Sequence, residues 1–164
     1  MHSAIFNRKF APVEAGRKVK MRDPRIAKLA KQVIEYSVSL KKGEKILIEA
    51  WDGSEDFVNE FVKAAQAVGG YPFVSLQNAQ VNRNFIMGTT EEAMRVWYAY
   101  QETRMKEMDA YISIRKQDNI YEYADVPAEK MAIYNKYHGM LHYGQRLPHT
   151  KWCVLRYPNG SMAQ

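Results

Sequence analysis

The stretch from residue 23 to residue 50, DPRIAKLAKQVIEYSVSLKKGEKILIEA, joins a helix to a buried strand and decides the fold class. Asp23 can cap the helix and Pro24 suits its first turn, because the carboxylate accepts orphan amides and the proline ring presets φ. One apolar stripe then recurs at helical spacing and comprises Ile26, Leu29, Ala30, Val33, Ile34 and Ser37. Gly43 ends this predicted helix, and the apolar run at 46–48 predicts a strand covered on both faces.

The same alternation of helix and strand continues to the end of the chain. Ser54 is the expected cap of a second helix, and Thr89 with Glu92 forms a capping box that opens a third. Further strands are predicted at 71–76, 110–114 and 151–156, with a last helix from Pro127. Helical crossovers between strands are right-handed, so the strands run parallel. We therefore predict an α/β fold: a three-layer, open, mostly parallel sheet of about four strands, with helices on both faces.

The topology is Rossmann-like, but the sequence carries no dinucleotide motif. Gly53 stands alone after the first strand, and Gly69 with Gly70 closes a helix instead of opening one. The sequence also has no HExxH metal motif, no Walker motif and no serine in a nucleophile elbow.

Composition is typical of one soluble domain. The 164 residues are 46% hydrophobic and 26% charged. No apolar run approaches the roughly 20 residues of a membrane helix, and the first residues contain no secretory apolar segment. The single cysteine, Cys153, cannot form an internal disulfide and is expected to be a buried, inert thiol. These observations predict a cytoplasmic protein.

The net charge of +6 is concentrated near the N-terminus. Residues 1–31 carry nine basic and two acidic side chains, whereas the rest carry fifteen and sixteen. Residues 1–22 lack sustained apolar periodicity, so we interpret them as a basic extension and 23–164 as the α/β domain. A solvated tail is the favoured interpretation of the extension. Two alternatives are a weak organellar presequence and an arm that binds nucleic acid or another acidic surface.

Open α/β sheets bind ligands at the carboxyl ends of their strands, which directs attention to the loops 51–54, 77–88, 116–125 and 157–164. Trp51 and Asp52 follow the first strand, and Asn119 follows the third. Each is a candidate for lining a substrate cleft, and Asn119 could hydrogen-bond a peptide backbone. The competing hypothesis for Asn119 is an Asx turn that holds its own loop.

His138, His142 and His149 are the only local metal candidates. His138 and His142 are spaced i, i+4 and can share one helical face, so with His149 they could bind zinc. The helix end around Gly139, Tyr143 and Gly144 is expected to be solvated and loosely packed, which favours structural imidazoles over ligands.

Several ordered segments resemble the thermophilic aminopeptidase family, the metallopeptidases of the aminopeptidase T, aminopeptidase S and PepS type. They comprise Tyr36, Ser37, Leu40, Lys41, Gly43, Glu44 and Ile48; residues 109–119; Asp125, Val126, Pro127 and Lys130; and Trp152, Tyr157, Pro158, Met162, Ala163 and Gln164. The resemblance implies an N-terminal domain that shapes the cleft. It also implies a second domain whose carboxylate, histidine and tyrosine ligands hold two divalent ions, zinc, cobalt or similar, that activate water against the first peptide bond.

Every position matching those ligands would fall after Gln164, so the resemblance assigns no catalytic or metal residue to this chain. It implies a domain truncated before the catalytic half, inactive and metal-free alone, whose full-length form is a homodimer acting on peptides. Neither a membrane nor a nucleic acid is the expected partner. Two alternatives remain open: a non-enzymatic binding module whose basic arm recruits RNA or another acidic partner, and a small zinc hydrolase built on the three histidines.

Overall fold

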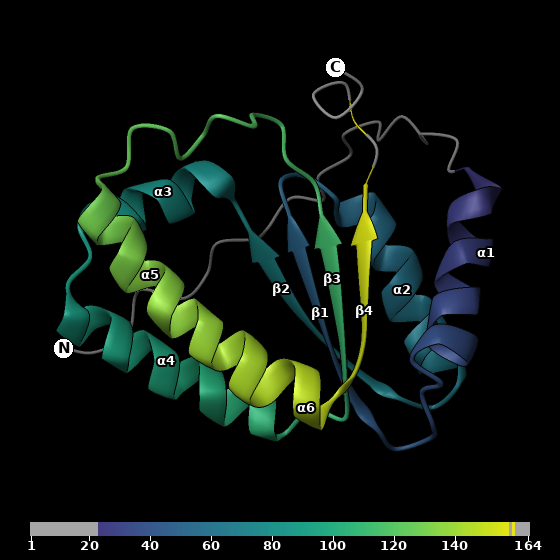
Figure 1. The fold of residues 1–164 in the computed structure, drawn as a ribbon. Helices are drawn as coiled ribbons and strands as arrows, with labels where there is room; N and C mark the ends of the chain where they lie inside the picture. The colour runs from purple at the N-terminus through teal and green to yellow at the C-terminus, as the bar shows by residue number, and fades with distance from the viewer. Residues whose placement is uncertain (1–22, 158, 160–164) are drawn as a thin grey trace, which may run out of the picture.

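The computed structural model describes residues 23–157 and residue 159, so the basic extension at 1–22 lies outside the described residues. Four strands form one parallel sheet in the order β2-β1-β3-β4 (Figure 1). They are β1 (Lys45–Trp51), β2 (Tyr71–Gln77), β3 (Ala110–Arg115) and β4 (Lys151–Arg156). The predicted α/β class and its four parallel strands are confirmed.

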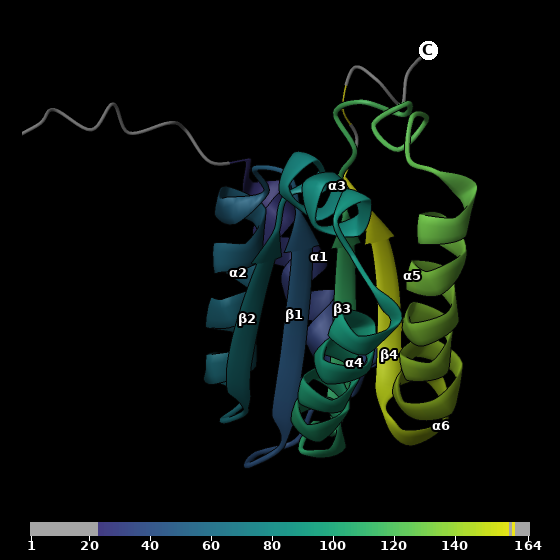
Figure 2. The same ribbon diagram turned by 90° about the vertical axis from the view of Figure 1, so that its left-hand side faces the viewer.

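Helices cover both faces of the sheet, as the apolar runs of β1 and β3 require. One face packs against α1 and α2, and the other against α4 and α5 (Figure 2). The helices are α1 (Pro24–Gln32), α2 (Glu55–Ala67), α3 (Ala79–Met87), α4 (Glu91–Lys106), α5 (Ala128–Leu141) and α6 (Leu147–His149). Two π-helical turns, η1 (Val33–Ser37) and η2 (His142–Arg146), extend α1 and α5. None of these helices is both long and apolar enough to cross a membrane.

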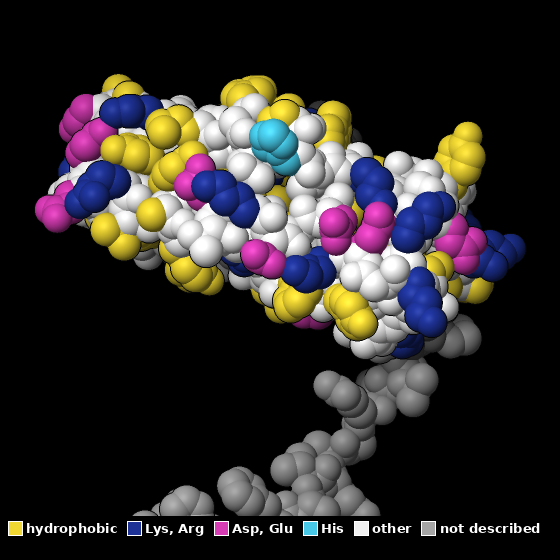
Figure 3. Space-filling model, turned by 90° about the horizontal axis from the view of Figure 1, so that it is seen from below, with side chains coloured by type: hydrophobic (Ala, Val, Ile, Leu, Met, Phe, Trp, Pro, Cys, Tyr) yellow, Lys and Arg dark blue, Asp and Glu magenta, His cyan; other side chains and the backbone are white. Residues whose placement is uncertain are grey.

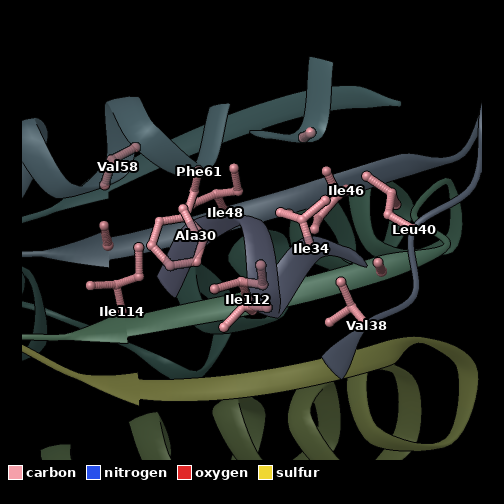
Figure 4. Close-up of a cluster of buried hydrophobic side chains, with 14 of the residues drawn as sticks. Ala30, Ile34, Val38, Leu40, Ile46, Ile48, Val58, Phe61, Ile112 and Ile114 are labelled. Carbon is pink, nitrogen blue, oxygen red and sulfur yellow. The ribbon is translucent and has the colours of Figure 1, made fainter. Parts of the chain in front are cut away.

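The larger core lies between the sheet and the α1–α2 layer (Figure 4). Alternate residues of a strand point to opposite faces, so the even-numbered residues of β1 and β3 enter this core. Ile48, Ile112 and Phe61 are fully buried there. The odd-numbered residues, among them Leu47 and Tyr111, face α4 and α5. This division leaves one face of the sheet available for polar side chains near the carboxyl ends of the strands.

The first helix ends earlier than predicted. The sequence pattern extends it to Gly43, but the helical segment stops at Ser37 with a π-helical turn. The amide of Val38 donates to the carbonyl of Val33 at 2.9 Å, which closes a wider turn. Ser39 then adopts φ 45°, a left-handed conformation that cannot continue a right-handed helix.

Two expectations around the third helix were wrong. Thr90, not Thr89, is the cap of α4: its hydroxyl accepts from the amide of Ala93 at 3.2 Å, whereas Thr89 is buried. The segment expected as a loop at 77–88 contains α3, which Asn78 caps by accepting from the amide of Val81 at 2.9 Å.

Candidate functional site

A pocket of about 390 Å³ opens between the α4–α5 side of the sheet and helices α3 and α5. Its lining includes the odd-numbered residues Glu49 and Trp51 of β1, and Ser113 and Arg115 of β3. Their common orientation follows from the two-residue period of a strand. The pocket therefore lies near the carboxyl edge of a parallel sheet, where such folds place their ligands.

A buried ion pair forms one wall of the pocket. Glu49 is 6% exposed and Arg146 2% exposed, and the Arg146 Nη2 donates to the Glu49 carboxylate at 3.0 Å. The Tyr111 hydroxyl donates to the other carboxylate oxygen at 2.9 Å, and the Arg146 guanidinium lies 4.7 Å from the Tyr111 ring centroid. Arg104 approaches the same carboxylate at 4.0 Å. These contacts compensate the carboxylate for its lost hydration.

Three rings stack along the pocket-facing side of α5 and η2. Tyr134, His138 and His142 are spaced four residues apart, and the centroids are 5.5 Å apart in the first pair and 6.2 Å in the second. Burial lowers the pKa of His138 to about 4, helped by the charge of Arg146. Burial also lowers the pKa of His142 and raises that of Tyr134 to about 12. All three side chains are therefore neutral at pH 7.

The opposite wall depends on an unusual backbone conformation at the end of β1. Asp52 adopts φ 47°, and its buried carboxylate accepts from the amide of Ala79 at 2.8 Å and from the Asn78 Nδ2 at 3.3 Å. This carboxylate thereby holds the first turn of α3 against the sheet. In α3, the Asn82 amide donates to the Tyr123 hydroxyl at 3.1 Å, which ties the loop before α5 to the same wall.

The structure distributes the predicted cleft residues over two pockets, and Asp52 lines both. Trp51 and Asp52 line the pocket, although the Asp52 carboxylate is occupied by α3. Asn119 lies instead in a second, smaller pocket of about 210 Å³. Its Oδ1 accepts from the amide of Tyr121 at 3.0 Å and its Nδ2 donates to Glu122 at 3.0 Å, which is the competing Asx-turn arrangement.

The three histidines are not gathered into one site. His138 and His142 line the main pocket, whereas His149 is exposed in α6 outside its lining. The helix end is solvated at Tyr143 and Gly144, as expected, whereas Leu141 and Arg146 beside them are buried. Within residues 23–157 and 159, no group of three or more His, Cys, Asp or Glu side chains is arranged to hold a metal. The donor set present therefore does not fit a divalent ion, and we assign no metal-dependent step to these residues.

Sequence reasoning missed the ion pair at the centre of the pocket. Glu49 interrupts an otherwise apolar buried strand, which is the one local signal that could have identified it. Arg146 gave no such signal, since its partner is 97 residues away. Cys153 is half-buried beside the larger core, where burial raises the pKa of its thiol, so it does not provide a reactive thiolate.

At the opposite end of the molecule, the described residues carry charges of both signs. Seen from below, Lys and Arg side chains are intermixed with Asp and Glu (Figure 3). Near the amino ends of the strands, Lys45 pairs with Glu107 at 2.7 Å and Lys151 pairs with Glu44. Such pairs neutralise each other locally, so the described part of this surface does not favour a polyanion.

The fold is similar to that of a solved structure, and the sequence matches a family model. Wild-type AmpT from Thermus thermophilus superposes with a TM-score of 0.65 at 20% sequence identity, over 83% of this chain and 36% of AmpT. A putative LacI-family transcription repressor from Corynebacterium glutamicum, at 11% identity over 80% of this chain and 59% of its own, reaches a TM-score of only 0.34 and carries no argument. No curated protein sequence matches the chain. The model of the thermophilic metalloprotease family M29 matches residues 22–164, and the chain therefore belongs to that family.

Proposed function

We propose that residues 23–164 form the cleft-side α/β domain of a metal-dependent aminopeptidase that removes N-terminal residues from peptides. Membership of the M29 metalloprotease family supports the reaction class. The observation that carries the domain role is the pocket at the carboxyl edge of the sheet, with Trp51 half-buried in its wall. The chain spans 36% of the length of AmpT, so the activity is proposed for a longer protein.

In this proposal two divalent ions would be held by residues outside 23–157, and they would supply the activation of water and the polarisation of the scissile carbonyl. The residues of this chain bind and orient the peptide. Trp51 and Tyr134 provide apolar contact area, while Asn82 and Ser113 offer hydrogen-bonding groups in the same pocket. A cytoplasmic homodimer is part of the same proposal.

The test uses the chain extended by the C-terminal half of an M29 relative, assayed on an aminoacyl-nitroanilide and on dipeptides. The extended protein should release amino acids and lose that activity on chelation. Trp51→Ala should raise KM by about tenfold with a small change in kcat, because uniform binding is lost. Trp152→Ala is the matched control, since Trp152 is 48% exposed on β4 and lies outside the pocket lining.

Peptide release that persists in chelator would contradict the metal-dependent mechanism. An equal rise in KM for Trp51→Ala and Trp152→Ala would contradict the assignment of the pocket to the substrate cleft. Both variants should be compared with the parent by thermal unfolding, so that a loss of fold is distinguished from a loss of binding.

A further inference from the structure

The main pocket carries more positive than negative charge. Its lining includes three basic side chains, Arg115, Lys116 and Arg146, but only two carboxylates, those of Glu49 and Asp52. Arg104, which lies outside the lining, approaches the same Glu49 carboxylate as Arg146, and the Nε of both guanidinium groups is buried without a hydrogen-bond partner among the described residues. The carboxylate of Asp52 already accepts two hydrogen bonds from the start of α3. Both carboxylates of the pocket therefore already have hydrogen-bond partners within the chain. The two buried Nε atoms have none, and such groups in a folded protein require an explanation.

The mouth of the pocket adds further cations. Arg115 ends β3, is exposed and lines the pocket, and no carboxylate of residues 23–157 forms an ion pair with it. Lys116 lines the pocket beside it and pairs with Asp118 at 3.1 Å. Burial is the main cause of the lowered pKa of His142, and the charges of Arg146 and Arg115 lower it further.

The rest of the lining is largely aromatic and apolar. Trp51 of β1, Ile86 of α3, and Met131 and Tyr134 of α5 surround one space of about 390 Å³. Pockets of roughly 300 to 1,000 Å³ with apolar walls and a few polar groups are the usual sites of small ligands. An arginine at the mouth of such a pocket fits a carboxylate, whose two oxygens accept a bidentate pair of hydrogen bonds.

We infer that this pocket binds a small carboxylate with an aromatic body, whose carboxylate contacts Arg115 and whose ring lies against Trp51 and Tyr134. The neutral imidazoles of His138 and His142 are additional hydrogen-bonding groups along its path. The ligand can be a free aromatic acid or the C-terminal residue of a short peptide, since both present the same chemistry. The inference concerns the pocket alone and does not depend on peptidase activity.

The experiment measures binding to the purified 164-residue chain by calorimetry and by shifts of the histidine ring signals in NMR spectra. The probe is 3-phenylpropionate, with 3-phenylpropionamide as its uncharged counterpart. The acid should saturate a single site and shift the signals of His138 and His142, while the amide binds about tenfold more weakly or not at all. The dipeptide Gly-Phe distinguishes the sources: tighter binding than the acid identifies a peptide C-terminus, and weaker binding a free acid.

Arg115→Gln should weaken binding of the acid by about tenfold. Arg156→Gln is the matched control, because Arg156 pairs with Arg115 in the sheet register, is also exposed, and does not line the pocket. It should bind the acid as the parent chain does. Equal binding of acid and amide, no saturable binding of the acid, or equal losses in the two variants would each overturn the inference, whatever the extended protein does to peptides.

Discussion

Replacing Glu49 by Gln tests whether the buried ion pair stabilises the folded chain. The substitution keeps the size of the side chain and an acceptor for the Tyr111 hydroxyl, but leaves Arg146 without its anion. At 3.0 Å and an effective dielectric constant of about 20, the lost attraction is about 5 kcal/mol. The remaining amide oxygen offsets part of it, so the free energy of unfolding should fall by about 3 kcal/mol, close to the cost of breaking other buried pairs.

The double variant Glu49→Gln/Arg146→Met separates the charge from the packing. Methionine retains contact with the Tyr111 ring and removes the uncompensated guanidinium, so the double variant should be more stable than Glu49→Gln alone. Urea unfolding followed by tryptophan fluorescence and circular dichroism gives each free energy. Glu107→Gln, at the exposed Lys45 pair, should leave the midpoint unchanged. The reasoning would be refuted if the loss of unfolding free energy in the double variant equalled the sum of the losses in Glu49→Gln and in Arg146→Met.

Three further predictions concern stability. The pKa of His138 is about 4 in the folded chain and 6.5 in the unfolded chain, so between these pH values the unfolded chain binds one more proton. The free energy of unfolding should therefore fall as the pH drops from 6.5 to 4. Urea titrations at several pH values should show a weaker pH dependence for His138→Gln. Asp52→Ala should cost about 2 kcal/mol, since it removes the acceptor for the first amide of α3 and places alanine at φ 47°, whereas Asp52→Asn should cost much less in the same assay. Gly70→Ala should cost about 1 to 3 kcal/mol, because its Cβ would lie 2.5 Å from Leu40, while Gly144→Ala, with open space around its Cβ, should leave thermal unfolding unchanged or raise its midpoint.

The sheet could be predicted because its signals are local. The apolar run in β1 and the β-favouring run in β4 are continuous in sequence, and the β4 bounds of 151–156 agree with the structure. Helix α3 could not be predicted in the same way. Its residues 79–87 include the polar Gln80, Asn82, Arg83 and Asn84, and its first amide is held by Asp52, 27 residues earlier.

The candidate site was only partly predictable for the same physical reason. Trp51 was found because it follows a predicted strand, and parallel strands gather their carboxyl ends at one edge. The partnership of Glu49 with Arg146 depends on how α5 and η2 pack over the sheet, which no local pattern encodes. The roles of Asn119 and of the three histidines also required coordinates, since spacing along the chain does not determine whether a side chain faces a pocket or its own loop.

The order β2-β1-β3-β4 has a kinetic consequence for how the chain acquires its structure. Strand β1 pairs with β2, which is nearby in sequence, but its other neighbour, β3, follows only after α4: the amide of Lys45, the first residue of β1, donates to Asp109, 64 residues later and just before β3. The entropy cost of loop closure over such distances precedes the gain from pairing, so we expect the docking of β3 to form part of the rate-limiting step of folding. Until β3 docks, the Glu49 carboxylate of β1 lacks the hydrogen bond from the Tyr111 hydroxyl. Its other partner, Arg146, lies still further along the chain.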